Sequence, residues 1–96
     1  MAFIQTISFS TDQIDAIREL ADEFARTGGD APGFRGSRIL RDRDRDGAYL
    51  VIAEFDSYEQ AMENSARPET DAFARRMREL VDGAPVYGNY DVIAEE

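Results

Sequence analysis

The 96-residue chain contains no cysteine, histidine, lysine or tryptophan. Without cysteine it can form no disulfide, no thiolate nucleophile and no zinc–thiolate site. Without histidine it lacks the usual imidazole base and metal ligand, and without lysine it cannot form a Schiff base with a carbonyl compound. Any catalysis would therefore depend on carboxylates, hydroxyls, side-chain amides, arginine or a bound cofactor.

Positive charge is scarce as well. Twenty acids stand against 11 bases, all of them arginine, and the net charge is −9. A chain with this balance repels polyanions, so we predict no nucleic-acid partner. No apolar run approaches the length of a membrane span, and no basic segment precedes an apolar one near the N-terminus, so we expect no membrane association and a cytoplasmic location. The length and the hydrophobic content of 43% predict one globular domain over residues 1–96.

The spacing of apolar residues predicts four strands and two helical regions. A first helix is expected over residues 11–26, because Ser10–Gln13 has the spacing of a capping box. The same S-x-x-Q pattern at Ser57–Gln60 predicts a second helix, which Pro68 should interrupt. The strands are expected at residues 1–9, 34–43, 48–55 and 86–93, the glycine-rich loop at 28–33 and the last helical piece at 69–80.

The resulting order, β-α-β-β-α-β, is that of ferredoxin-like α+β proteins, in which helices cover one face of a four-stranded antiparallel sheet. The other face of a single chain would be bare and should be polar. The third predicted strand instead has Leu50 and Ile52 on the face opposite Tyr49 and Phe55, and the first strand adds Ile4. We therefore predict a homodimer in which a second copy covers the open face, tolerated surface residues being the alternative.

These features resemble the dimeric α/β-barrel superfamily, in particular its antibiotic biosynthesis monooxygenase-like branch. In that branch an acidic-aromatic pair typically ends the third strand, and a short Ser-capped helix, a break and a longer helix follow. The stretch AEFDSYEQAM at residues 53–62 supplies Glu54-Phe55 and Ser57, and Pro68 supplies the break. The resemblance implies a homodimeric α/β barrel with a pocket between the sheet and the helices of each protomer.

Three functions follow from the resemblance and stay open. The chain could bind a small hydrophobic or aromatic molecule, act as a cofactor-independent oxygenase on an aromatic polyketide-like substrate, or serve as a structural dimerisation module. The branch also includes haem-degrading enzymes, but these need an axial ligand that is usually histidine. We therefore expect no cofactor.

The candidate pocket residues are polar groups and apolar walls. Gln5 is the odd polar residue on the face of Phe3 and Ile7, and Asn64 falls near a position where the branch often places an active residue. Arg38 could contact an anion, or it could simply offset nearby acids. Core packing is the alternative for the apolar and aromatic members. The predicted ligand-binding set is Gln5, Arg38, Tyr49, Asn64, Phe73, Met77 and Tyr90, with no catalytic residue assigned.

The stretch Asp42–Gly47, DRDRDG, begins like an EF-hand calcium loop. Position 12 of such a loop should be a bidentate glutamate, but here it is Ala53, and Glu54 arrives one residue late. Strand-like flanks, where an EF-hand has helices, also argue against calcium, so we predict no metal site. We interpret the stretch as a solvated hairpin tip, closed at Asp46-Gly47, with its charges alternating between the two sides of an extended ribbon.

Overall fold

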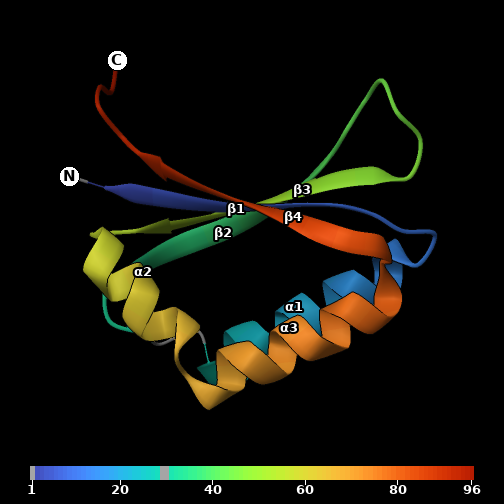
Figure 1. The fold of residues 1–96 in the computed structure, drawn as a ribbon, viewed down its shortest axis with the longest axis horizontal. Helices are drawn as coiled ribbons and strands as arrows, with labels where there is room; N and C mark the ends of the chain where they lie inside the picture. Colours follow the sequence, from blue (N-terminus) through green and yellow to red (C-terminus); the bar gives the residue numbers. More distant parts are fainter. Residues whose placement is uncertain (1, 29–30) are drawn as a thin grey trace.

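A computed structural model gives the fold of residues 2–28 and 31–96. Four antiparallel strands and three helices confirm the predicted ferredoxin-like α+β arrangement, with the second helical region in two pieces (Figure 1). In chain order the elements are β1 (Phe3–Ser10), α1 (Ile14–Gly28), β2 (Phe34–Arg41), β3 (Ala48–Phe55), α2 (Tyr58–Ser65), α3 (Pro68–Leu80) and β4 (Asp82–Asp91).

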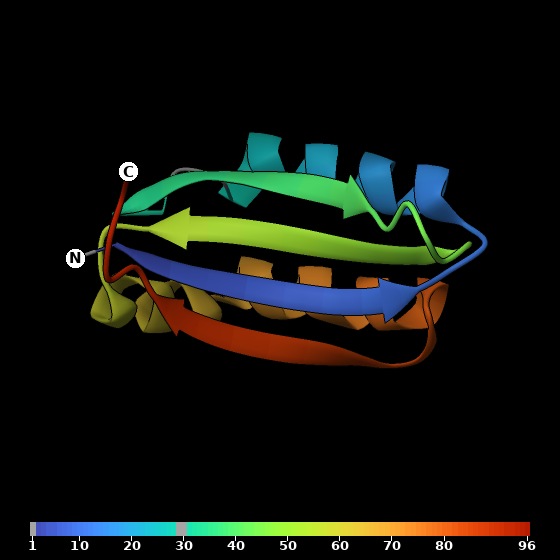
Figure 2. The same cartoon turned by 90° about the horizontal axis from the view of Figure 1, so that it is seen from above.

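The strands are ordered β2-β3-β1-β4, so β1 and β3 are central while β2 and β4 form the two edges. All three helices lie on one side of the sheet (Figure 1). Figure 2 views the sheet from its other side, with the helices behind the strands. We call this second side the open face.

The break between α2 and α3 has the predicted cause. Ser57 caps α2, and its Oγ accepts a hydrogen bond from the Gln60 backbone N–H at 3.2 Å. Pro68 occupies the first turn of α3, where its missing N–H costs nothing, and the extended Arg67 before it ends the preceding helical run.

The predicted capping box at the start of α1 is wrong. Ser10 is the last residue of β1, and the helix begins only at Ile14. The neighbouring Thr11, 3% exposed, forms a local turn just ahead of the helix: its Oγ1 accepts from the Gln13 backbone N–H at 3.0 Å and donates to the Leu80 carbonyl at 2.6 Å. This hydroxyl joins the start of α1 to the end of α3, a contact between positions that sequence spacing alone cannot relate.

The hairpin tip is a loop, not the extended ribbon that we predicted, because β2 ends at Arg41. The Asp42 carboxylate accepts a hydrogen bond from the Asp44 backbone N–H at 2.9 Å and lies 3.5 Å from the Arg45 Nε. These local bonds compete with strand pairing. The tight turn at Asp46-Gly47 is confirmed: the Ala48 N–H reaches back to the Arg45 carbonyl, and Gly47 has φ +77°, which favours glycine.

The last strand begins earlier than predicted, at Asp82 rather than Val86. The strand includes Gly83 and Pro85 because β4 is an edge strand, and an edge tolerates proline since one side of its backbone needs no partner. Of the predicted 28–33 loop, Gly29 and Asp30 lie outside the described residues. In the part of the chain that the structure describes, no helix is both long and apolar enough to cross a membrane.

Candidate functional site: a polar seam under the sheet and two hollows above it

The helix-facing side of the sheet is packed as two separate apolar clusters. The first joins Phe9 of β1 to α1 and α3 through Ile17, Leu20 and Met77. The second joins Phe3 of β1 to the end of β3 and to α2 through Phe55 and Ala61. Each buried member of the two clusters is 6% exposed or less. The layer between sheet and helices is therefore filled at both ends.

Gln5 lies between these clusters. Along β1 it separates Phe3, in the second cluster, from Ile7, which packs against the first. Its register partners are Ala53 on β3 and Asn89 on β4, so two side-chain amides stand next to each other on the helix-facing side. Apolar packing stops here and polar groups take its place.

Asn64 and Thr70 form a polar pair at the break between α2 and α3. The Thr70 hydroxyl donates a hydrogen bond to the Asn64 Oδ1 at 3.3 Å. This hydrogen bond uses neither amide N–H group of Asn64. We refer to Gln5, Asn89, Asn64 and Thr70 together as the polar seam: the first two are register partners on the helix-facing side, with Asn89 at an exposed edge position, and the other two lie at the break between α2 and α3. Its amides and hydroxyl could hold an oxygen-bearing ligand, but the seam contains no charged group or strong base.

The predicted pocket residues do not form one site. Tyr49 of β3 and Phe73 and Met77 of α3 lie between the sheet and the helices, on the same side as Gln5. They pack into the first cluster or against it, and Met77 is only 1% exposed. Tyr49 also stacks on Phe9, with ring centroids 5.8 Å apart. Of the predicted set, only Gln5 and Asn64 belong to the seam. Asn89 and Thr70 were missed; Asn89 could have been found from strand alternation with Tyr87, had the register against β1 been known.

Arg38 and Tyr90 lie on the opposite, open face. Arg38 is paired in register with Ile52, and Tyr90 with Ile4, both of which point away from the helices. A two-residue period decides the face of every strand residue, so the register of the edge strands separates these two residues from the seam.

The open face is poor in charge at its centre. Three successive rows cross the sheet here, following the register of the strands. Within these described residues, Glu54 is the one acid and Arg38 the one base. The rows, written in the order β2-β3-β1-β4, are Gly36-Glu54-Ile4-Tyr90, Arg38-Ile52-Thr6-Gly88 and Leu40-Leu50-Ser8-Val86.

Two hollows indent this face. One, of about 330 Å³, lies over the start of β2 and is lined by Ile4, Ile52, Arg38 and their neighbours; we call it the Gly36 hollow. The other, of about 490 Å³, lies at the far end of the sheet beside Leu50, Arg45 and Val86. Both are on the side of the sheet away from the polar seam.

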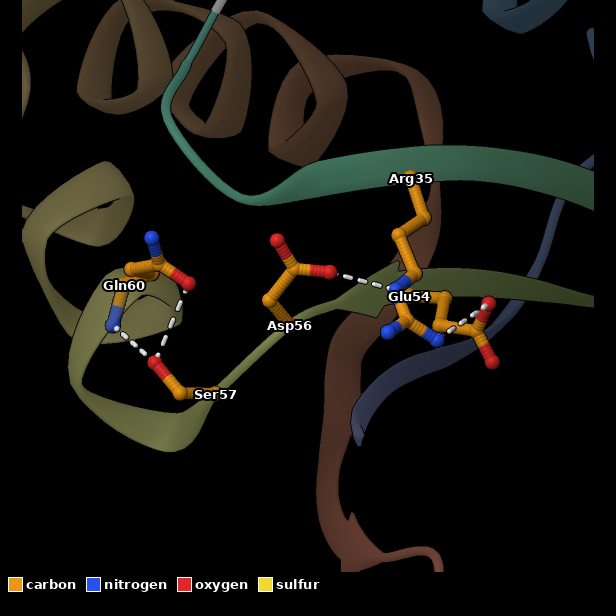
Figure 3. A network of polar contacts seen from close by, with 5 residues as sticks. All are labelled: Arg35, Glu54, Asp56, Ser57 and Gln60. Atoms are coloured by element: carbon orange, nitrogen blue, oxygen red, sulfur yellow. Dashed lines mark hydrogen bonds and ion pairs between the residues drawn. The ribbon is translucent and has the colours of Figure 1, made fainter. Parts of the chain in front are cut away.

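Arg35 and Glu54 line the Gly36 hollow, and with Asp56 they form an ion cluster (Figure 3). The Nε of Arg35 donates a hydrogen bond to Asp56 Oδ1, and its Nη1 lies 3.9 Å from Glu54 Oε2. The hydrogen bond to Asp56 is the largest cause that raises the pKa of Arg35, so Arg35 keeps its charge at any ordinary pH. The Arg38 guanidinium, in contrast, makes no ion pair or side-chain hydrogen bond with the residues that the structure describes.

The calcium-like stretch gathers no metal ligands. Asp42 is engaged by Asp44 and Arg45, as described above. Across residues 2–28 and 31–96, no group of three or more acidic side chains is placed to hold a metal ion.

Solved structures show the same fold at low sequence identity. SnoaB, a cofactor-independent oxygenase from Streptomyces nogalater solved as an asparagine-to-alanine variant, superposes with a TM-score of 0.85 at 20% identity, over 98% of this chain and 95% of that one. Rv0793 from Mycobacterium tuberculosis superposes with a TM-score of 0.81 at 15% identity, over 99% and 98%. A conserved protein from Methanosarcina mazei does so with a TM-score of 0.83 at 8% identity, over 94% and 91%.

Sequence comparison identifies the family directly. Among curated proteins, no sequence matches the chain significantly. The family model described as antibiotic biosynthesis monooxygenase matches residues 1–76, which contain β1, α1, β2, β3, α2 and most of α3. This protein therefore belongs to the antibiotic biosynthesis monooxygenase family.

Proposed function

We propose that this protein is a homodimer that binds a small planar aromatic molecule at the polar seam of each protomer. The observation that supports a ligand-binding site is the interruption of apolar packing at Gln5. Amides beside apolar walls are the usual composition of a small-molecule site, because a few polar groups orient a ligand whose body packs on aliphatic and aromatic side chains.

The walls suit an aromatic ring with oxygen substituents. Phe73 and Met62 each pack at the edge of one apolar cluster, and both surfaces favour flat apolar groups. The amide N–H groups of Asn64 and Asn89 can donate to a phenol, a phenolate or a quinone oxygen. A net charge of −9 disfavours ligands with several negative charges.

A second candidate function is cofactor-independent oxygenation, which family membership and the fold shared with SnoaB favour. A substrate that ionises readily at a benzylic carbon can supply the electrons itself. Conversion of that CH₂ to a carbonyl then consumes one O₂ and releases one H₂O. The protein would orient the substrate and accept its proton, and the asparagine altered in the SnoaB variant makes Asn64 the first residue to test. If the protein binds no such ligand, the remaining function is that of a structural dimerisation module.

The homodimer rests on the open face. Ile4, Leu50 and Ile52 are only partly buried in one chain although they lie on central strands. Two copies with a charge of −9 each repel one another unless their contact is nearly neutral, and the three central rows carry one acid and one base. A second copy would also cover the apolar rows that a lone antiparallel sheet should avoid exposing.

The ligand is tested by thermal shift against planar hydroxylated aromatic compounds, with flavin and haem in the same panel. A compound that binds the native state raises the melting temperature, and the rise continues with the logarithm of the free ligand concentration above the dissociation constant. We expect hydroxylated tricyclic aromatics to stabilise the protein, and Asn64→Ala to abolish the shift while Gln13→Ala, an exposed polar control, keeps it. A shift that survives Asn64→Ala and Asn89→Ala alike would contradict the seam as the site.

Catalysis is tested separately with an oxygen electrode. Oxygen uptake by the same compounds, above the uncatalysed rate and lost in Asn64→Ala, supports oxygenation. If a compound binds but no oxygen is consumed, the result supports the ligand-binding function and contradicts the oxygenase function.

A further inference from the structure

One edge of the open face has a hollow, and the opposite edge has a projection. The Gly36 hollow lies at β2, and the exposed aromatic ring of Tyr90 lies at β4, in the same cross-sheet row. The two features are separated by the width of the sheet, so they cannot meet within one chain. They can meet between two chains.

Glycine keeps the hollow open. No atom lies within 4 Å of the position that a Cβ on Gly36 would occupy, so the space above this residue is empty. Ile4 and Ile52 provide an apolar floor, and Arg38 stands at the side with a guanidinium that has no ion-pair partner among residues 2–28 and 31–96. Such a hollow suits a flat ring, because a guanidinium attracts the face of an aromatic ring.

Glycine also determines how Tyr90 lies. A Cβ on Gly88 would come within 2.7 Å of Tyr90 Cε2, 2.9 Å of Tyr90 Oη and 2.6 Å of Thr6 Oγ1. The Tyr90 ring therefore lies against the backbone at Gly88 and extends along the open face. It is 58% exposed, and its hydroxyl has no hydrogen-bond partner among the described residues.

A two-fold axis parallel to the strands brings these features together. Two sheets that pack face to face keep their strands nearly aligned. With the axis between β1 and β3, β2 of one chain faces β4 of the other, and each row meets itself in reverse order. Gly36 then faces the partner's Tyr90, Arg38 faces the partner's Gly88, and Leu40 faces the partner's Val86.

Between the edge strands, the matches in this arrangement are of large against small residues and of apolar against apolar ones. Over the central strands, Ile52 faces the partner's Thr6, Leu50 faces the partner's Ser8, and Glu54 faces the partner's Ile4. A two-fold axis across the strands would instead place β2 over its own copy, which brings Arg38 near the partner's Arg38. Like charges in a desolvated contact are unfavourable, so the first axis is preferred.

We propose that the partner's Tyr90 inserts into the Gly36 hollow, with its ring against Ile4 and Ile52 and beneath the Arg38 guanidinium. By symmetry the contact forms twice, once at each edge of the paired sheets. This inference rests on the proposed homodimer and assigns its two-fold axis and an aromatic contact at each edge of the paired sheets.

Tyr90→Ala tests the contact, and Tyr87→Ala is its matched control. Tyr87 is on the same strand and is 48% exposed, but it faces the helix side. By sedimentation equilibrium we expect Tyr90→Ala to weaken the dimer by about tenfold or more, because two aromatic contacts are lost per dimer, and Tyr87→Ala to leave it unchanged. Both substitutions are at exposed positions, and circular dichroism verifies that each variant is folded.

A double-mutant cycle tests the pairing with Arg38. Arg38→Ala alone should weaken the dimer, and the Arg38→Ala/Tyr90→Ala double variant should weaken it by less than the two separate effects combined. Additive effects, or equal dimer affinities for Tyr90→Ala and Tyr87→Ala, would overturn the contact and leave the homodimer standing. A wild-type chain that stays monomeric would overturn the homodimer and this inference together.

Discussion

The two faces of the sheet are made from alternate residues of the same strands, and they differ in how far one chain completes them. On the helix-facing side, Phe3 and Phe9 of β1 are 2% and 6% exposed. On the open face, Ile4 of the same strand is only partly buried, although it lies between two other strands. The helices of the same chain cover the helix-facing side, whereas they leave the open face uncovered.

The comparison separates two kinds of apolar residue. Those facing the helices stabilise the protomer, because their burial needs no second molecule. Those on the open face stabilise the protomer little and should contribute mainly when another surface covers them. Substitutions on the two faces should therefore differ in kind as well as in size.

The largest effect is expected from Phe55→Ala. Phe55 is 1% exposed and anchors the cluster that holds α2 against the sheet. Removal of its ring leaves a cavity, and the free energy of unfolding should fall by about 3–5 kcal/mol. Urea unfolding at a fixed protein concentration measures this loss. A change no larger than that of an exposed substitution would show that the helix-facing layer is not the core.

A smaller effect is expected from Thr11→Val, which keeps the shape of the side chain and removes its hydroxyl. The Leu80 carbonyl and the Gln13 N–H would both lose their partner at a partly buried place, at a cost of about 1–3 kcal/mol. Thr11→Ser is the control, since it keeps both hydrogen bonds. Equal stabilities of the Val variant and the wild type would contradict the role of this hydroxyl.

The smallest effect on the protomer is expected from Leu40→Ser. Leu40 lies on the edge strand β2, is 38% exposed and faces the open side. At low protein concentration, the free energy of unfolding measured by thermal denaturation should change by less than about 1 kcal/mol. The rise of the melting temperature with protein concentration, expected for a dimer, should be reduced. If the substitution destabilises the protein equally at all concentrations, Leu40 is a core residue of the protomer.

Local signals in the sequence predicted most of the fold. Ser57 and Pro68 each act through their own backbone neighbours, so the cap of α2 and the break before α3 could be predicted from spacing. The role of Thr11 could not be predicted in this way, because the Leu80 carbonyl to which its hydroxyl donates lies 69 positions away. The DRDRDG tip failed as a ribbon because Asp42 bonds locally to Asp44 and Arg45 instead of continuing the strand.

The candidate site was predicted less well for a related reason. Alternation gives the residues that share a face within one strand, but only the register between strands decides which strands share that face. Gln5 was identified by its position between apolar neighbours. Tyr90 and Arg38 were grouped with it although the register places them on the other side, and Asn89, its true neighbour on β4, was overlooked.

Sedimentation equilibrium of the wild-type protein over low-micromolar concentrations tests the central claim most directly. If a second copy completes the open face, the measured mass should be twice the 10.8 kDa of one chain, and Leu40→Ser should shift it toward that of a single chain. A mass of one chain throughout this range would contradict the account, because the apolar rows of the open face would then be exposed to water in the native protein.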